Sequence, residues 1–215
     1  MDWNLIIGGL AAIGTLMVAV LAIWGDWFRN KFASPDLTIM PHNFRGNLTT
    51  IYFMAGGQAT SNSIKAIYYH IKIVNKKKWV TVKNCRVLLT DMHKKGPDGL
   101  FHRLPLVVPL QLVWTPAELA PILQTFCDQE ICDFGRLLEG TNAYQPTLYG
   151  IPNNFMGSVK SNEAIRFTLK IMAENYISEK KWVYEVAWDG IFSDNMDIME
   201  RSLIVKEIKD NLTTG

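Results

Sequence analysis

Hydrophobic and polar positions follow two different patterns along this chain. From Leu5 to Trp24 the sequence runs for twenty residues without a formal charge, and Thr15 is its only clearly polar side chain. At about 1.5 Å per residue, a helix of this length reaches about 30 Å, the thickness of one hydrocarbon core. Its backbone groups would be bonded internally, as lipid requires. The pattern therefore predicts a single transmembrane helix at residues 5–24.

Two other interpretations of this stretch remain open. A cleaved signal peptide begins with basic residues and has a short apolar core, whereas residues 1–4 contain no Lys or Arg and only residues 20–22 suggest a cleavage site. A buried helix of a soluble domain usually keeps a polar face over this length. A transmembrane helix explains the sequence better than either alternative.

After Pro35, apolar and polar residues alternate with the period of two that is typical of half-buried strands. The clearest case is residues 164–176 and 182–192, joined by a polar turn at 178–181, which predicts a β-hairpin. Further strands are expected at residues 36–40, 64–74, 80–92, 104–114, 125–128, 131–137 and 202–208, with a possible one at 50–54.

Turn-forming residues predict the connections between these strands. Residues 44–62 are expected to be mostly turn, 93–103 a loop, and 139–158 a long Gly-, Asn- and Pro-rich excursion. The stretch 115–118 resembles a helix start, and Pro121 limits that helix to about one turn.

Roughly seven to nine short antiparallel strands, with turn signals every eight to twelve residues or so, predict a two-sheet sandwich or a partly open barrel. The pattern of residues 74–75 and 82–87 is similar to strand pairs in immunoglobulin-like sandwiches, a likeness of architecture that carries no activity. The expected fold is therefore mainly β: one N-terminal transmembrane α-helix followed by an immunoglobulin-like β-sandwich. The expected division is a tail at 1–4, the membrane helix at 5–24, a juxtamembrane linker at 25–35, the β-sandwich domain at 36–208 and a flexible tail at 209–215.

Charge and cysteine content suggest where the protein lies. No Lys or Arg precedes the apolar stretch, while Arg29 and Lys31 follow it, which favours a single-pass protein of the plasma or inner membrane with the N-terminus outside and the C-terminal domain in the cytoplasm. Three cysteines are an odd, sparse set that suits a reducing compartment. The formal net charge of +2 is too small to predict a nucleic-acid partner.

Few residues suggest chemistry. Cys127 and Cys132, with His93 and His102, could be imagined as a zinc site. However, the two cysteines are an odd number of positions apart, which places their thiols on opposite faces of a regular strand. We expect both cysteines to be small, buried hydrophobic side chains, and we expect no metal.

Other constellations are equally weak. Cys85 beside His70 could form a nucleophile and base, yet no nucleophile elbow or activating helix start is present. The acidic group Asp128, Glu130 and Asp133 could hold calcium, but a solvated strand face or turn explains it better. Neither common phosphate-binding glycine motif occurs, so no cofactor and no enzymatic activity are expected.

Two basic runs end in tryptophan, and both lie in predicted turns. Side chains at such junctions could combine charge with stacking to bind an anion, either a lipid headgroup or a phosphorylated ligand. The simpler interpretation is that the lysines provide solubility and protect strand ends. The residues concerned are Lys77, Lys78, Trp79, Lys180, Lys181 and Trp182.

Two hypotheses for function follow. The first is a non-enzymatic, membrane-anchored domain that recruits a protein partner at the cytoplasmic face. The second is a ligand-gated effector that senses a small anion, such as a nucleotide, and assembles through its membrane helix. The first is favoured, because no residue group points clearly to a ligand.

Small residues also gather along one side of the apolar helix, within an arc of roughly 80°. Such a stripe allows two helices to approach closely in lipid and to form a homo-oligomer, although any span rich in Ala and Gly shows some stripe. Its members are Gly8, Ala11, Ala12, Thr15, Ala19 and Ala22.

We expect Ala11→Leu combined with Ala19→Leu to lower the fraction of chains cross-linked to one another in membranes, because the larger side chains separate the helices. Ile13→Leu, on the other side of the helix, serves as the control and should leave the cross-linked fraction unchanged. An equal fraction in all three proteins would show that the stripe does not mediate association.

Overall fold

The computed structural model describes residues 3–55, 58–116 and 119–208. The predicted tail at 209–215 and half of the expected helix start at 115–118 therefore lie outside the described residues. In the described part of that start, the backbone amides of Leu119 and Ala120 both donate to the Pro116 carbonyl, at 3.1 and 2.9 Å.

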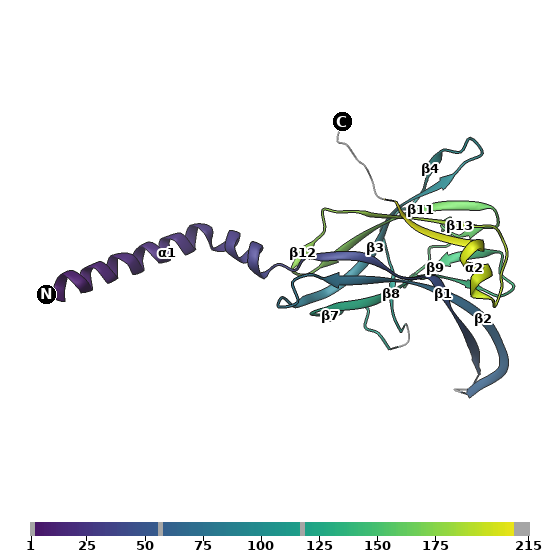
Figure 1. Ribbon diagram of the computed structural model, residues 1–215, viewed down its shortest axis with the longest axis horizontal. Helices are drawn as coiled ribbons and strands as arrows, with labels where there is room; N and C mark the ends of the chain where they lie inside the picture. Colours follow the sequence, from purple (N-terminus) through teal and green to yellow (C-terminus); the bar gives the residue numbers. More distant parts are fainter. Residues whose placement is uncertain (1–2, 56–57, 117–118, 209–215) are drawn as a thin grey trace.

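Two helices and fourteen strands make up the described chain (Figure 1). The helices are α1 (Trp3–Ala33) and α2 (Met196–Ser202). The strands are β1 (Leu37–Ala55), β2 (Gln58–Asn75), β3 (Val82–Lys95), β4 (Phe101–Leu104), β5 (Leu110–Gln111), β6 (Val113–Trp114), β7 (Gln124–Phe126), β8 (Gln129–Leu138), β9 (Ala143–Pro146), β10 (Val159–Lys160), β11 (Glu163–Ala173), β12 (Tyr176–Ile177), β13 (Trp182–Trp188) and β14 (Leu203–Ile208).

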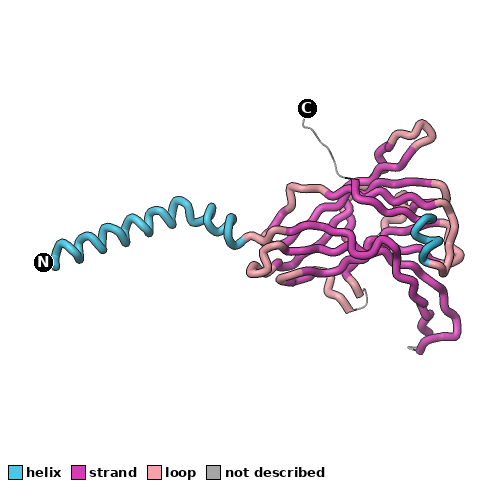
Figure 2. The backbone as a smooth tube through the Cα atoms, in the orientation of Figure 1, coloured by secondary structure: helices cyan, strands magenta, loops and turns pink. Residues whose placement is uncertain are grey.

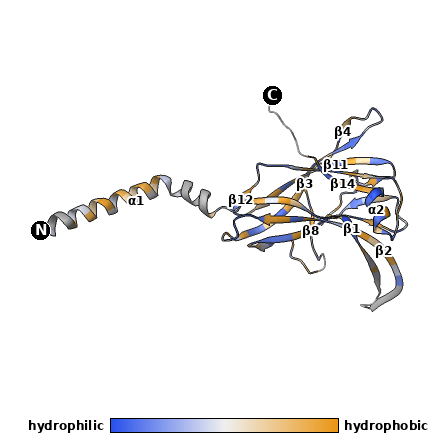
Figure 3. Cartoon of the chain, viewed as in Figure 1, coloured by the Kyte–Doolittle hydropathy of each residue, from blue (hydrophilic) through white to orange (hydrophobic). Residues whose placement is uncertain are grey.

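Helix α1 extends away from the rest of the molecule and is apolar over much of its length (Figure 3). Its 19-residue stretch Ile7–Gly25 is long and apolar enough to cross a membrane, and none of it is buried against the strands. It does not pack as the core helix of a soluble domain. The helix continues through most of the stretch expected to be a linker and ends just before Ser34 and Pro35, where the proline disfavours helical backbone in the residue before it.

The strands form two antiparallel sheets packed as a sandwich, and the barrel is not closed. The six-stranded sheet has the order β1-β2-β8-β9-β10 with β6 beside β8; the eight-stranded sheet has the order β14-β13-β11-β3-β4, with β5, β7 and β12 at its margins. The predicted hairpin is confirmed as β11 and β13, paired from Glu163–Trp188 to Leu169–Trp182. The mainly-β sandwich class is therefore correct.

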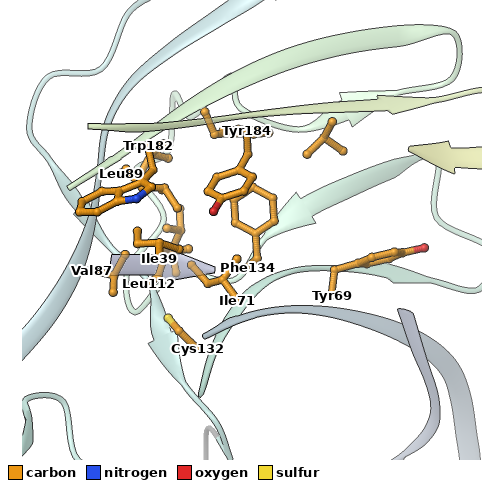
Figure 4. Packing of buried hydrophobic residues seen from close by; sticks show 14 of the residues in the cluster. Ile39, Tyr69, Ile71, Val87, Leu89, Leu112, Cys132, Phe134, Trp182 and Tyr184 are labelled. Carbon is orange, nitrogen blue, oxygen red and sulfur yellow. The ribbon is translucent and has the colours of Figure 1, made fainter. Parts of the chain in front are cut away.

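Alternating inward residues of both sheets form the core, as period-two strands require. Aromatic rings fill its middle: the Phe134 ring lies 5.5 Å from that of Tyr184 and 5.9 Å from that of Phe167, centroid to centroid. Figure 4 shows Phe134 and Tyr184 facing one another from opposite sheets. Offset and edge-on contacts of this kind add to the free energy gained from burial alone.

The prediction that residues 44–62 are mostly turn is wrong. β1 and β2 are long strands that pair from Leu37–Asn75 to Ala55–Gln58, and beyond the sheet they continue as a two-stranded ribbon (Figure 2). We call residues 50–55 and 58–65 of this ribbon the arm. Asn and Gly residues favour turns. Here, however, the backbone hydrogen bonds between two long paired strands are available to residues of almost any type.

Three smaller expectations also need correction. Residues 93–103 are a hairpin rather than a loop, because β3 extends to Lys95 and pairs with β4. The excursion at 139–158 contains β9, which pairs with β8. Helix α2 was not expected; Asn195 caps it by accepting a hydrogen bond from the Asp197 amide at 2.9 Å.

Asn75 joins three segments at the end of the sandwich near α1. The side chain is fully buried, and its Oδ1 accepts from the backbone amides of Asp36 and Lys77 at 3.2 and 3.1 Å. Its Nδ2 lies 2.7 to 3.0 Å from the carbonyls of Lys77, Val80 and Cys127. One amide thus connects the start of β1, the β2–β3 turn and the β7–β8 turn.

Asn75→Ala should destabilise the protein by about 2–4 kcal/mol, because it leaves several buried backbone groups without partners. Thermal unfolding of the full chain in detergent, followed by near-UV circular dichroism, should show a midpoint lower by roughly 4–16 °C. The exposed Asn153 offers the matched control, and Asn153→Ala should unfold with the wild type. Equal midpoints for both variants would contradict this account of Asn75.

Candidate functional site

A bulge in β8 brings a polar group to the outer face of the six-stranded sheet. His70 pairs with Asp133 and Tyr69 pairs with Gly135, so β8 has one more residue than β2 at this point. The extra residue reverses the alternation of side chains beyond it. Asp133 and Arg136 consequently both lie on the outer face, although three positions separate them.

Glycine is required at the bulge. A Cβ on Gly135 would lie 2.2 Å from the Tyr144 hydroxyl oxygen and 2.7 Å from the Gln145 carbonyl oxygen. Both distances are shorter than real Cβ contacts, and the second atom belongs to the backbone, which cannot move aside cheaply. Close packing against β9 therefore fixes the bulge at this position.

β1 is also irregular where it passes His70. Its register shifts between Pro41 and Asn43 and again between Asn43 and Asn47, and Gly46 takes a φ of +90° that favours glycine. These shifts bring the side chains of Asn43 and Asn47 together, with Asn43 Nδ2 2.6 Å from Asn47 Oδ1.

A chain of hydrogen bonds runs from β1 across β2 to β8. Asn47 Nδ2 lies 3.2 Å from Nδ1 of His70, and His70 Nε2 lies 3.1 Å from Oδ1 of Asp133. The Thr115 hydroxyl donates to the same Oδ1 at 2.5 Å. His70 and Asp133 are only 7% and 3% exposed, which is unusual for charged or titratable side chains on the outer face of a sheet.

The partners of the imidazole indicate its tautomer. The Asn47 amide nitrogen is a donor, because its oxygen already accepts from Asn43. His70 Nδ1 is therefore the acceptor, and Nε2–H donates to Asp133. His70 is neutral in this arrangement, and both of its ring nitrogens are engaged.

This polar group forms the floor of an open cleft. The arm and the β6–β7 connection project on the same side of the molecule (Figure 1), and the cavity between them has a volume of about 510 Å³. It is lined by β1 between Asn47 and Tyr52, by Tyr68 and His70, by Thr115 and Pro116, and by Asp133. We call it the arm cleft.

Two cations and a second histidine lie near the arm cleft on the same sheet face. Arg136 Nη1 donates to the Tyr68 hydroxyl at 3.2 Å. The His42 ring lies 6.5 Å from that of His70, and burial, followed by the charge of Lys72, lowers the pKa of His42. Asp133 forms an ion-pair contact only with His70 among the residues that the structure describes.

The structure separates the groups that the sequence suggested as metal sites. Cys132 is buried, as expected, and its thiol donates to the Val113 carbonyl at 3.1 Å. The same expectation is wrong for Cys127, which is exposed in the turn between β7 and β8. His93 and His102 lie on the other sheet, in β3 and β4. Within the described residues, no three His, Cys, Asp or Glu side chains are grouped closely enough to share a metal ion.

The other two constellations do not form either. Cys85 is buried in the core on β3, in the opposite sheet from His70, and burial raises the pKa of its thiol to about 12. The exposed Asp128 pairs with Lys78 at 2.7 Å. Asp133 is buried at the floor of the arm cleft, on the outer face of the six-stranded sheet. The acidic residues 128, 130 and 133 therefore do not converge.

The two lysine runs lie at the same end of the sandwich, near α1 (Figure 1). Lys77 Nζ donates to the Ser34 carbonyl at 3.1 Å, and Asn175, in the connection between β11 and β12, donates to the Thr81 carbonyl at 3.0 Å. Trp79 is 76% exposed, whereas Trp182 is only 1% exposed and belongs to the core. A ligand therefore has access to the Trp79 ring but not to the face of the Trp182 ring.

Lys180 and Lys181 line a separate cavity of about 810 Å³ over the outer face of the eight-stranded sheet. Arg166 also lines this cavity. It pairs with Glu185 at 2.9 Å, and its guanidinium carbon lies 3.8 Å from the Phe101 ring centroid. Three acidic residues line the same cavity, namely Asp91, Glu179 and Glu207. The mixed charge gives an anion no clear preference for this cavity.

The small residues of α1 lie free on the helix. Gly8, Ala11, Ala12, Thr15, Ala19 and Ala22 are exposed, and the Thr15 hydroxyl donates back to the Ala11 carbonyl at 2.9 Å. Nothing in the sandwich covers this stripe, so it stays available to a second helix.

No protein-family model matches this sequence, and no curated protein is significantly similar to it. The functional argument therefore rests on the geometry described above.

Sequence reasoning had noticed His70 and Asp133 but had assigned them to different groups. The alternation of residues 64–74 places His70 on the polar face, and Asp133 lies between the apolar Cys132 and Phe134. The expectation that Asp133 belongs to a solvated strand face or turn is wrong, because the residue is 3% exposed. The bulge and the β1 register shifts that bring the two residues together have no clear sequence signal.

The cysteines provide a test of the core. A maleimide at pH 8 should label one thiol per native chain, because Cys127 is exposed while burial raises the pKa of both Cys85 and Cys132. Mass spectrometry of Cys127→Ser should find no rapid labelling, and unfolding this variant should release two reactive thiols. Rapid labelling of native Cys127→Ser would contradict the placement of the other two cysteines.

Proposed function

We propose that this chain is a single-pass, membrane-anchored binding module without enzymatic activity of its own. Its sandwich recruits a protein partner at the cytoplasmic face of the membrane, and the partner lies in the arm cleft as an extended segment. The observation that carries the proposal is the arm, a ribbon that leaves the sheet and forms one wall of an open cleft with a buried polar floor.

The arm has the features of a strand-binding site. β1 is the last strand of its sheet, so along the arm one edge has no neighbouring strand among the described residues. Free edges accept added strands through their backbone groups. A two-stranded ribbon is marginally stable alone in water, and a third strand from a partner would stabilise it.

The base of the arm is held firmly, which suits a binding role. Lys65 pairs with Asp194, and Arg45 pairs with Asp197 of α2. The Glu139 amide donates to the Lys65 carbonyl at 2.8 Å. These contacts join the base of the arm to α2, to the segment before it and to the end of β8.

The arrangement at the cleft floor favours binding over catalysis. A nucleophile needs a base within hydrogen-bond reach, but the Thr115 hydroxyl donates to Asp133 rather than to the imidazole. Both nitrogens of His70 are engaged, so the ring has no free position from which to accept a substrate proton.

The membrane location rests on α1 and on sequence charge. The apolar stretch Ile7–Gly25 is long enough to span, and the nearby Arg29 and Lys31 favour a cytoplasmic sandwich. The alternative of a ligand-gated effector keeps one supporting observation, the uncovered stripe of small residues on α1. It lacks a clearly cationic pocket for the anion.

A photo-cross-linking amino acid at Tyr52 should test the proposal in membranes of cells that make the protein. Tyr52 lines the arm cleft and is 59% exposed, so we expect a discrete adduct whose cross-linked peptide is an extended segment of a partner. The same amino acid at Trp79, exposed at the opposite end, is the control and should not form this adduct. Absence of the adduct at Tyr52, or its presence at both positions, would argue against recruitment through the arm cleft.

A further inference from the structure

Resting on the proposed function, we propose that the arm cleft recognises a basic side chain of the bound segment. The group it takes is a primary ammonium or a guanidinium, and Asp133 is the residue that pairs with it. Three features of Asp133 support this: its burial, the unused oxygen of its carboxylate, and the lack of an ion pair with any described Lys or Arg.

Asp133 lacks a charged partner in the described part of the chain. Its carboxylate is 5% exposed, and moving an ionised carboxylate out of water is costly unless a cation or several donors compensate. The one basic group in contact is His70, whose Nδ1 accepts from Asn47 and whose ring is therefore neutral. A cationic ligand would supply the missing charge.

One oxygen of the carboxylate remains available. Both protein donors, the Thr115 hydroxyl and His70 Nε2, meet Oδ1, and no described residue donates a hydrogen bond to Oδ2. Oδ2 is not one of the solvent-inaccessible polar atoms that lack a hydrogen-bond partner, so it keeps contact with solvent. Asp133 also lines the arm cleft. This oxygen is thus directed to the place that a ligand would occupy.

The remaining walls suit a cation more than an anion. Among the described residues that line the cleft, Asp133 is the only Asp, Glu, Lys or Arg, so this described lining carries a net negative charge. The rings of Tyr52 and Tyr68 lie in the walls, and aromatic faces attract ammonium and guanidinium groups. A cavity of about 510 Å³ also has room for a lysine or arginine side chain together with its backbone.

The cations nearby do not occupy this position. Arg136 is directed to the Tyr68 hydroxyl, with its guanidinium carbon 6.0 Å from the Tyr68 ring centroid, and neither Arg136 nor Lys72 forms an ion pair with Asp133 among the described contacts. Arg136 thus contacts the aromatic wall, and the described cations leave the floor of the cleft to the ligand.

Selection from a random decapeptide display library tests the inference, with the full-length protein in nanodiscs as bait. Wild-type protein should enrich peptides that carry Lys or Arg at one fixed position. Replacing that residue with acetyl-lysine or citrulline in a selected peptide should weaken binding about tenfold or more, measured by fluorescence anisotropy, because the charge is lost while the shape is kept.

Asp133→Asn is the decisive variant, because asparagine keeps an acceptor for Thr115 and His70 but carries no charge. It should bind the basic and the neutral peptide equally. Asp91→Asn makes the same change on the other sheet, where Asp91 pairs with Arg103 at 3.0 Å, and it should retain the full preference. If Asp133→Asn fails to fold, a competition experiment with the wild-type protein provides the same evidence. The cation n-butylammonium should displace the basic peptide, and the neutral n-butanol should not.

The outcomes separate this inference from the proposed function. Peptides enriched without a basic position, or an equal preference in wild type and Asp133→Asn, would overturn the cation site while leaving a binding module intact. Enrichment of no peptide over empty nanodiscs would overturn both. Binding of a neutral sugar such as mannose that depends on Asp133 would also overturn the inference, because it would identify a hydroxyl ligand.

Discussion

The alternation of side chains between the two faces of β8 determines which of its residues enter the core and which lie on the outer face of the sheet. In an uninterrupted strand, Phe134 and Arg136 would point to the same side, because they are two positions apart. The bulge opposite Tyr69 and His70 removes that constraint. Phe134 can then join the aromatic core while Arg136 and Asp133 both face outward, so one inserted residue serves the packing of the core and the polar floor of the cleft.

The bulge in turn depends on close packing inside the sandwich. Gly135 lies so near the Tyr144 hydroxyl and the β9 backbone that no side chain fits there. The ring of Tyr144 lies against those of Tyr69 and Phe134, at 5.8 and 6.3 Å between centroids. Rings of this size in a close-packed interior leave no space for a shift of register. Packing in the core therefore determines which side chains of β8 face outward.

The sequence predicts the regular parts of the structure well and the irregular parts poorly. Residues 164–176 and 182–192 alternate so clearly that the hairpin of β11 and β13 was predictable. The arm was predicted only in part, as a possible strand at residues 50–54, because the Asn, Gly, Ser and Thr residues around it favour turns and its strands depend on backbone pairing with each other. Helix α2 has a cap at Asn195 and an acidic first turn, but seven residues are too few for helical periodicity to be evident.

The candidate site shows the same limit more sharply. His70 and Asp133 are 63 positions apart, and their contact requires the correct pairing of β2 with β8 together with the bulge beside it. Asn47 reaches His70 only after two register shifts in β1. A pattern of alternation defines a face, but it does not define which strands are neighbours or where an extra residue enters, so the cleft could be found only in three dimensions.

The position of the cleft relative to α1 agrees with recruitment of a protein from solution. α1 continues to Ala33, eight residues past the end of the apolar stretch at Gly25, which adds about 12 Å of helix between the hydrocarbon and the sandwich. The lysine turns lie at the near end of the sandwich, and the arm lies toward the far end (Figure 1). In the proposed membrane-anchored arrangement, the end with the lysine turns faces the membrane surface and the arm cleft faces away from it, as recruitment of a partner from solution requires.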